Sequence, residues 1–241
     1  FQKFPEFNFE NNMADKEPMY NLLIDFYKYG FVIIKNVPTE DKYLLKFVNS
    51  IGPVKVTNFG EYFDVMSKPN PNDLAYKPIA LPPHTDNPYR KPAAPGIQFL
   101  HCLKNEVSGG FSTLVDGFAV AEYLKHNNLE AFESLTTTNL RYQFQDKDIV
   151  LENWGELIEL DKDGDYKQVR YSTRVDYVPP LETEKLRIFY QPYFEGDITV
   201  TRNVGVTKGS TILSNQKDTI VDLGRYLNVL KGIVNKLSNG D

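Results

Sequence analysis

The feature that most constrains the fold is the run of short strand-like segments, separated by turns, that begins at Gly96. "GIQFLHCL" predicts a buried strand, and "SGGFSTLVDG" predicts a turn and a strand that closes on Gly117. "GELIELDKDGDYKQVRYS" predicts a hairpin with its turn at 162–165. The letters of that turn also occur in calcium loops, but strands rather than helices flank it here. We therefore expect a plain Asp-Gly hairpin turn.

Helical patterns dominate the beginning of the chain. "EPMYNLLIDFYKYG" predicts an amphipathic helix that ends at Gly30, and "FVIIKNV" predicts the strand that follows. "DKYLLKFVNSIG" repeats the helix pattern, and "FAVAEYLKHNNLEAFESL" is helical as well. Early helices outside many short strands predict a mainly β fold with helical additions, a β-sandwich or double-sheet jelly roll. The apolar positions of the first helix are Leu22, Leu23, Phe26 and Tyr27.

The composition is that of a globular protein, with 41% hydrophobic and 24% charged residues in 241. No repeat or Ser/Gly-rich linker divides the chain, so we expect one domain over 1–241. The aromatic fraction of 13% suits sheet faces and small-molecule pockets. A net charge of −5 without a basic block argues against nucleic acid as a partner.

Cellular location is indicated by what the sequence lacks. No apolar run is long enough for a transmembrane helix, and the start has no signal-peptide pattern. The one cysteine, Cys102, excludes a disulfide framework and is expected to be a small buried hydrophobic residue in a reducing cytoplasm. The chain does not begin with Met, so we expect a fragment of a longer gene product.

The stretch "ALPPHTDNPYR" places His84 and Asp86 two positions apart. On an extended segment both side chains point to the same side, where an imidazole and a carboxylate offer two adjacent metal ligands. A second histidine would complete the facial triad of non-heme Fe(II) oxygenases. The alternative is a surface turn in which Asp86 caps a backbone N–H.

The surroundings of this pair resemble a known family. The stretch from "IGPVKVTNFGEYF" to "GGFSTLVDGFAVAEYLK" is similar to the γ-butyrobetaine hydroxylase-like branch of the taurine dioxygenase family, as are "YGFVIIKNVP" and the predicted hairpin. The resemblance spans about 20–193, whereas 194–241 diverge. It implies a double-stranded β-helix, a jelly roll of the clavaminate synthase-like type. It also implies Fe(II) with 2-oxoglutarate as co-substrate, and hydroxylation of a small trimethylammonium or amino-acid-like substrate.

The resemblance also implies roles for single residues. His84 and Asp86 match the first two iron ligands, and Tyr76 matches an aromatic residue around the substrate's trimethylammonium group. Asp73 stands where the family has an Asn that binds 2-oxoglutarate. Leu100 matches a residue that lines the 2-oxoglutarate site. Asn87, Tyr89 and Arg90 lie just past the metal pair, and we expect them to shape the substrate mouth.

The family's third iron ligand is a histidine near the C-terminus, followed by an arginine that binds 2-oxoglutarate. This chain has three histidines, and none lies beyond His126. We expect His126 to be solvated and His101 to be structural. On one account, "KGSTILSNQKDTIVDLGRYL" is a decayed counterpart of the distal segment, with Ile220 at the histidine position and Arg225 in place of the arginine. The residues nearest the family pattern are Gly209 and Asn215, with Asp218 or Asp222 as substitutes for the imidazole.

On a second account, the end of the chain is unrelated to the family. "DTIVDLGRYLNVLKGIVNKLSNGD" has a 3-4-3-4-3 apolar spacing that predicts an amphipathic helix, for core packing or for a homodimer. Both accounts leave a second functional hypothesis open, a non-catalytic relative that binds a small ligand or a partner chain. The apolar positions of this helix are Ile220, Leu223, Leu227, Leu230, Val234 and Leu237.

Overall fold

The computed structural model describes 4–9, 15–66, 81–91, 96–105, 112–172, 176–177, 201–204, 211–215 and 219–223. In the last four ranges the description concerns the backbone, and of their side chains only Thr211 is placed.

The helices are α1 (Lys16–Tyr29), α2 (Tyr43–Ile51), α3 (Gly117–Asn127) and α4 (Leu129–Thr137). The strands in the first half are β1 (Glu6–Asn8), β2 (Phe31–Lys35), β3 (Ile97–His101) and β4 (Ser112–Asp116). The middle strands are β5 (Leu140–Asp146), β6 (Ile149–Gly155), β7 (Ile158–Leu160), β8 (Tyr166–Val169) and β9 (Asp176–Tyr177). The last are β10 (Thr201–Val204), β11 (Thr211–Asn215) and β12 (Thr219–Leu223).

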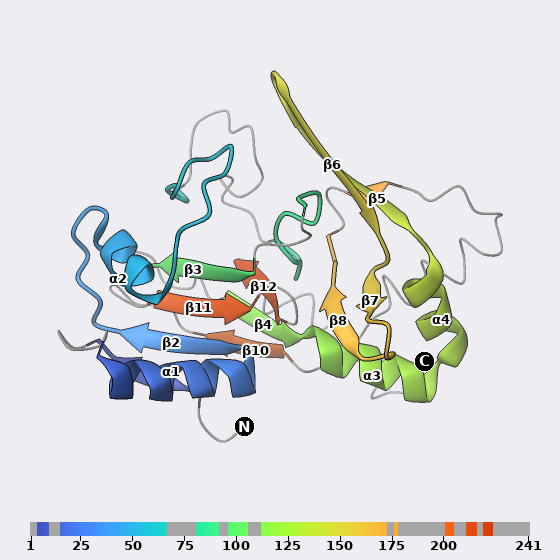
Figure 1. The fold of residues 1–241 in the computed structure, drawn as a ribbon, viewed down its shortest axis with the longest axis horizontal. Coiled ribbons are helices and arrows are strands. Elements are labelled where there is room, and N and C mark those ends of the chain that lie inside the picture. The colour runs from blue at the N-terminus through green and yellow to red at the C-terminus, as the bar shows by residue number, and fades with distance from the viewer. Residues whose placement is uncertain are drawn as a thin grey trace.

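The strands form a jelly roll with helices on its outside, as predicted (Figure 1). One sheet has the order β1-β2-β11-β3, and a second has the order β10-β4-β12. A further sheet, β6-β5-β9, and the hairpin β7-β8 continue the fold beside α3 and α4. Most strands that lie side by side in the two main sheets are far apart in the sequence, as is typical of a jelly roll.

Strand β2 shows why this sheet is buried on both faces. Its side chains alternate with period 2, so Phe31 and Ile33 pack against Leu114 of β4 in the facing sheet. Val32 and Ile34 point the other way, into a core formed with the helices. That second core contains Leu22 and Phe26 of α1, Val37, and Phe47 of α2.

Helix α1 ends where the sequence predicts. Gly30 adopts the left-handed conformation with φ 73°, and its N–H donates to the Phe26 carbonyl at 2.8 Å. The apolar face is narrower than predicted, because Leu22 and Phe26 are buried whereas Leu23 is 36% and Tyr27 90% exposed. Tertiary packing thus uses only half of the predicted apolar positions.

The hairpin β7-β8 confirms the Asp-Gly turn. The Asp161 carboxylate accepts hydrogen bonds from the backbone N–H groups of Asp163 at 2.9 Å and Asp165 at 3.0 Å. Gly164 takes φ 86°, which suits glycine. The acidic side chain therefore caps its own turn.

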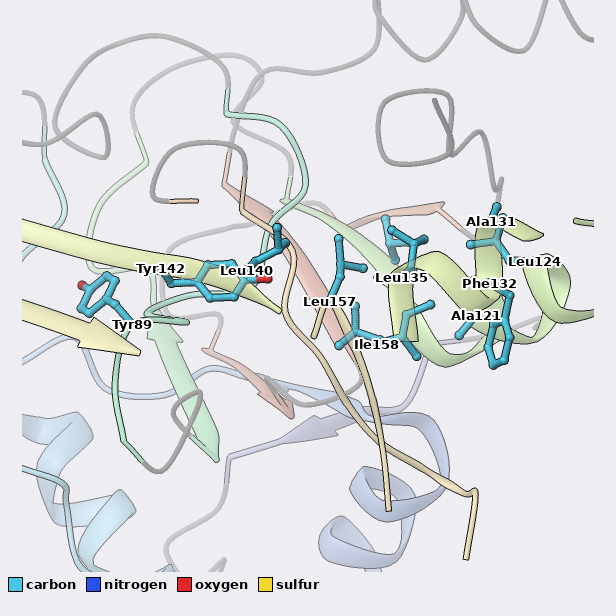
Figure 2. Close-up of a cluster of buried hydrophobic side chains, with 12 residues drawn as sticks. Tyr89, Ala121, Leu124, Ala131, Phe132, Leu135, Leu140, Tyr142, Leu157 and Ile158 are labelled. Carbon is cyan, nitrogen blue, oxygen red and sulfur yellow. The ribbon is translucent and has the colours of Figure 1, made fainter. Parts of the chain in front are cut away.

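A third core joins the helices α3 and α4 to the middle strands (Figure 2). The helical stretch breaks at Asn128, whose side chain accepts a hydrogen bond from Ala131 N–H at 3.1 Å and so caps α4. Asp116 caps α3 in the same way through Ala119 N–H at 2.9 Å. Leu135, Leu140 and Ile158 are among the most deeply buried members of this core.

The end of the chain corrects the helix prediction. Residues Thr219–Leu223 form β12, which pairs antiparallel with β4 in the register Ile220 to Val115. Strand β11 lies between β2 and β3, and β10 pairs with the other edge of β4. The predicted helix is therefore wrong for 219–223, because neighbouring strands offer backbone partners to this segment. The rest of that prediction, 224–241, lies outside the described residues.

Strand β3 is also less buried than predicted. Ile97 is 46% exposed, and the rest of the strand is half-buried. Cys102, just after it, is likewise only half-buried, and burial raises the pKa of its thiol. None of the helices in the described part of the chain has the length and apolar character needed to cross a membrane.

Candidate metal centre

His84 and Asp86 direct two ligand atoms toward each other. His84 Nε2 lies 3.1 Å from Asp86 Oδ1, and the imidazole is only 4% exposed. His84 Nδ1 donates to the Pro82 carbonyl at 2.8 Å. Since a carbonyl oxygen can only accept, Nδ1 carries a hydrogen, which leaves Nε2 as the ring atom that can bind a metal. Nε2 and Oδ1 therefore lie in direct contact at the point where a bound metal would meet both side chains.

This spacing fits a metal ion. Ligand atoms about 2.1 Å from a first-row divalent ion, at right angles to each other, lie about 3.0 Å apart. The observed 3.1 Å between Nε2 and Oδ1 agrees with that value. One nitrogen and one carboxylate oxygen also match the donor set of non-heme iron sites. The residues present therefore fit two adjacent positions around an Fe(II) ion.

The backbone between the two ligands is anchored to the end of β8. Thr85 N–H donates to the Tyr171 carbonyl at 2.6 Å, and Tyr171 N–H donates to Thr85 Oγ1 at 2.9 Å. Thr85 is 1% exposed, so water does not compete for these hydrogen bonds. This reciprocal pair fixes the segment from which His84 and Asp86 project.

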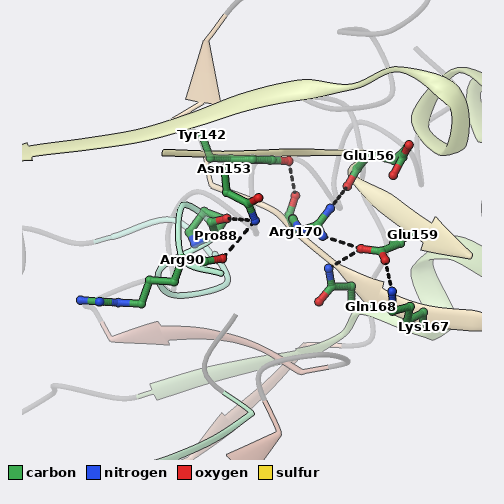
Figure 3. A network of polar contacts seen from close by, with 9 residues as sticks. All are labelled: Pro88, Arg90, Tyr142, Asn153, Glu156, Glu159, Lys167, Gln168 and Arg170. Atoms are coloured by element: carbon green, nitrogen blue, oxygen red, sulfur yellow. Dashed lines mark hydrogen bonds and ion pairs between the residues drawn. The ribbon is translucent and has the colours of Figure 1, made fainter. Parts of the chain in front are cut away.

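A second anchor holds the residues that follow the ligands. The buried Asn153 of β6 donates from Nδ2 to the Arg90 carbonyl at 3.0 Å and, at 3.4 Å, to the Pro88 carbonyl (Figure 3). A loop with few backbone partners of its own is thereby tied to a strand. On the opposite side, Gln98 of β3 donates from Nε2 to Asp86 Oδ2 at 2.5 Å.

A buried ionic network supports the segment that follows β8 and carries Tyr171. Arg170, 6% exposed, pairs through Nη2 with the Glu159 carboxylate and donates from Nη1 to the Glu156 carbonyl at 3.2 Å (Figure 3). Burial raises the pKa of Glu159, but the hydrogen bond from Lys167 and the charges of Arg170 and Lys167 outweigh it. The pKa therefore lies below its ordinary value.

Tyr89, the residue predicted at the substrate mouth, packs against the middle strands. Its ring is 5% exposed and stacks on Phe144 at a centroid distance of 5.1 Å, within the third core. The Tyr89 hydroxyl donates to Asn87 Oδ1 at 2.5 Å. The ring of Tyr89 therefore packs within the third core, and its place at a substrate mouth stays a prediction. Asn87, at a positive φ of 53°, is half-buried and lies directly after the ligand pair.

Other predicted site residues lie around the pair or beyond the described ranges. Leu100 packs between the two main sheets against Phe31 and Leu114. Arg90 donates from Nη2 to Asn58 Oδ1. Three predicted cofactor or substrate residues lie outside the described residues, namely Asp73, Tyr76 and Arg225.

A third ligand is not visible in the part of the chain that the structure describes, where no His, Cys, Asp or Glu joins the pair to make a group of three. His126 lies exposed on α3 and donates from Nδ1 to the Glu122 carbonyl at 2.9 Å, as expected for a solvated residue. His101 lies at the end of β3, where burial lowers its pKa and a backbone hydrogen bond with Val37 partly opposes that shift. Ile220, the expected position of the distal histidine, lies on β12.

The sequence matches the family described as "Taurine catabolism dioxygenase TauD, TfdA family" over residues 2–205. The chain belongs to the TauD/TfdA family. The predicted resemblance is thereby confirmed.

Curated relatives within the TauD/TfdA family include two enzymes of one name. The γ-butyrobetaine dioxygenase of Pseudomonas sp. (strain AK-1) is 33% identical over 181 residues, 75% of this chain and 47% of the relative. The human γ-butyrobetaine dioxygenase is 30% identical over 194 residues, 78% of this chain and 49% of the relative. Bovine mitochondrial trimethyllysine dioxygenase is 35% identical over 152 residues, 63% of this chain and 34% of the relative. The chain thus spans about half the length of the first two and a third of the last.

Solved structures agree on the fold at low sequence identity. An asparagine oxygenase in complex with Fe(II), 2S,3S-3-hydroxyasparagine and succinate has a TM-score of 0.65 at 12% identity, and the match covers 95% of this chain and 90% of that chain. The non-heme iron oxygenase OrfP in complex with Fe, succinate and (3S)-hydroxy-L-Arg has a TM-score of 0.66 at 12% identity, with 95% and 91% covered. These likenesses show the TauD-like jelly roll.

The residues that surround His84 and Asp86 were not predicted from the sequence. Gln98 is a polar residue inside the apolar run "GIQFLHCL". A polar side chain in such a run indicates a specific hydrogen-bond partner, which here is Asp86. Thr85 gives no signal in the sequence, although its hydroxyl accepts the hydrogen bond from Tyr171 N–H. Asn153 gave no local signal, because its partners lie more than 60 residues away, at a separation of 63 for Arg90.

Proposed function

We propose that this chain carries the iron-binding part of an Fe(II)- and 2-oxoglutarate-dependent dioxygenase that resembles γ-butyrobetaine dioxygenase. The observation that carries the proposal is the 3.1 Å approach of His84 Nε2 to Asp86 Oδ1. The opposite atoms of both side chains are already engaged, Nδ1 by Pro82 and Oδ2 by Gln98. What remains is a converging pair of metal ligands.

In this function His84 and Asp86 would hold Fe(II), which together with 2-oxoglutarate supplies the redox chemistry for hydroxylating a C–H bond with O₂. The chain's own residues would orient the two iron ligands and keep water away from the segment that carries them. The Pro82 carbonyl fixes the tautomer and rotation of the His84 ring, and the Thr85 contact with Tyr171 holds the ligands at a constant separation.

The co-substrate and substrate contacts follow from the family resemblance. Leu100 would line the 2-oxoglutarate site from β3, since its side chain already faces the space between the sheets. Asp73 and Arg225 would contact 2-oxoglutarate, and an aspartate facing a dianion would weaken that hold unless it is protonated. Tyr76 would contact the substrate cation through its ring face, with Asn87 beside the iron ligands.

The substrate class is supported by the names of the relatives. Both γ-butyrobetaine and trimethyllysine are compounds with a trimethylammonium group, and two solved structures of the same fold are in complex with hydroxylated amino acids. We therefore assign a small trimethylammonium or amino-acid-like molecule as substrate. The net charge of −5 favours such a cation over nucleic acid.

The chain is further proposed to form one domain. Support comes from the pairing of β10, β11 and β12 with strands from the first half of the chain. A homodimer stays a prediction, since the apolar seam that suggested it begins with Ile220 and Leu223, which lie on β12, and continues beyond the described residues.

A non-catalytic relative is the second candidate. It is favoured by one observation, that the described residues bring no third His, Cys, Asp or Glu to His84 and Asp86. Two protein ligands hold a divalent ion less tightly than three, and such a protein would bind a small ligand without turnover.

Anaerobic calorimetry with Mn(II), with and without 2-oxoglutarate, tests the proposal. Micromolar binding that 2-oxoglutarate strengthens is the expected result, and Asp86→Ala should abolish it while the far-UV circular dichroism is unchanged. Asp163→Ala is the matched control, because Asp163 lies exposed in the hairpin turn and should leave binding as it is. Absence of Mn(II) binding by the unaltered protein would reject the enzyme and favour the non-catalytic candidate. Equal affinity in Asp86→Ala would place the metal elsewhere.

A further inference from the structure

The Asp86 carboxylate is contacted from a neighbouring element. Gln98 Nε2 donates to Asp86 Oδ2 at 2.5 Å, from a strand position 12 residues further along the chain. This is a charge-assisted hydrogen bond in a half-buried place, where it is stronger than between exposed groups. We propose that Gln98 is a positioning residue for the metal centre, which holds Asp86 as a ligand through a single oxygen. This inference rests on the proposed function.

The orientation of the Gln98 amide follows from the charge beside it. The carboxylate accepts and cannot donate when ionised, so the amide must turn its NH₂ group toward Asp86. Gln98 Oε1 is then buried, and it has no hydrogen-bond partner among the described residues. An amide that leaves its oxygen unsatisfied is unfavourable in a protein interior, so the orientation is dictated by Asp86 rather than by the strand.

The hydrogen bond from Gln98 gives the two oxygens of the Asp86 carboxylate different partners. Oδ2 is engaged by Gln98, and Oδ1 faces His84 Nε2 at 3.1 Å. A carboxylate without this restraint rotates about its Cβ–Cγ bond and binds a metal through either oxygen or both. With Oδ2 engaged by Gln98, Asp86 would hold a metal through Oδ1 alone.

The backbone of strand β3, which carries Gln98, is held in place by the sheet. Strand β3 pairs with β11 over its whole length, and Gln98 lies opposite Ser214 in that register. The next two residues of the strand, Phe99 and Leu100, pack into the cores on the two faces of the sheet. Because of this, the amide cannot follow a moving carboxylate, and Asp86 is fixed relative to the sheet as well as to Thr85.

The test replaces the amide without changing the length of the side chain. Gln98→Met removes the donor and keeps the volume, and Gln143→Met is the matched control, because Gln143 lies on β5 and its amide contacts the exposed Glu152. Mn(II) affinity is measured by anaerobic calorimetry, and the visible absorption of the Co(II)-loaded protein reports the coordination geometry. We expect Gln98→Met to lose 10–100-fold in Mn(II) affinity, on the order seen for groups that orient metal ligands, and to change the Co(II) spectrum. Gln143→Met should match the unaltered protein in both.

A thermal unfolding curve of the metal-free variant separates positioning from folding. Should Gln98→Met fail to fold, Gln98→Asn keeps the amide but is one methylene too short to reach Asp86, and the same loss is expected. Unchanged Mn(II) affinity and an unchanged Co(II) spectrum in a folded variant would overturn the role of Gln98 while leaving the metal site standing. Lack of metal binding in the unaltered protein would instead overturn the proposed function on which this inference depends.

Discussion

Replacing Gly155 by alanine should destabilise the fold through Arg170. Gly155 is the last residue of β6, and a methyl group built on it would lie 1.8 Å from Arg170 Nη1 and 2.6 Å from Cζ. Real side chains do not approach so closely, so the guanidinium must leave its place. Its pairing with Glu159 and its hydrogen bond to the Glu156 carbonyl would both be lost (Figure 3).

The size of the loss in stability depends on the partners that Glu159 keeps when Arg170 moves away. Breaking one partner away from a buried ion pair costs about 3–5 kcal/mol when the other charge is left uncompensated. Here Glu159 keeps Lys167 and the Gln168 amide as partners, and its side chain is 17% exposed. The relevant loss is therefore nearer that of a hydrogen bond to a charged group, roughly 1.5–3 kcal/mol. We expect the free energy of unfolding to fall by about 2–3 kcal/mol.

Urea unfolding followed by circular dichroism at pH 7 measures this loss. Gly52→Ala is the control, because its backbone is extended and no heavy atom lies within 4 Å of the added methyl. It should change stability by less than about 0.5 kcal/mol. Adding Arg170→Met should cost far less in the Gly155→Ala background than in the unaltered protein. A loss below about 1 kcal/mol, or full additivity of the two substitutions, would refute the reasoning.

The same variant has a predicted pH dependence. The pKa of Glu159 lies below its ordinary value of 4.5 in the folded protein. Its ionic contribution is thus fully present above pH 4.5 and is lost as the pH falls through the lower, folded pKa. The difference between Gly155→Ala and the unaltered protein should shrink accordingly in acid.

Three further predictions concern the site and its surroundings. Thr85→Val removes the acceptor of Tyr171 N–H and should lower the free energy of unfolding by about 1–3 kcal/mol and weaken Mn(II) binding, measured by urea unfolding and calorimetry. Burial lowers the pKa of His101 below 6.5, so the unfolded chain takes up the proton first, and stability should fall as the pH drops through 6.5. His101→Gln should flatten that slope in unfolding curves between about pH 7.5 and 5.5, and an unchanged slope would contradict the assignment. Gly164→Ala forces a side chain into φ 86° and should cost about 1 kcal/mol in thermal unfolding, with the circular dichroism spectrum intact.

Local features of the fold could be predicted because their partners lie a few residues apart. Gly30 ends α1 through a hydrogen bond to Phe26, and Asp161 caps the hairpin turn within four positions, at Asp165. The outcome at the C-terminal segment was different. The spacing of Ile220 and Leu223 fits a helix, yet the segment pairs with β4, whose edge supplies backbone hydrogen-bond partners that the sequence pattern does not reveal.

In the candidate site, too, some features could be predicted from the sequence and others could not. The spacing and surroundings of His84 and Asp86 predict that they form the candidate metal site. The residues that orient these two side chains could not be predicted from the sequence. Gln98 reaches Asp86 from 12 positions away, and Tyr171 reaches Thr85 from 86 positions away. The stacking of Tyr89 on Phe144 of β5 was likewise not evident from the sequence, because the two residues are far apart along the chain.

The sequence by itself therefore determined the elements whose stability comes from neighbouring residues, and the close spacing of His84 and Asp86. Tertiary structure alone decided which face of α1 is buried, that 219–223 is a strand, and how the carboxylate of Asp86 is held. The physical reason is that these outcomes depend on contacts between segments separated by tens of residues. Such contacts exist only once the sheets have formed, whereas caps, turns and ligand spacing are set by bond geometry along the chain.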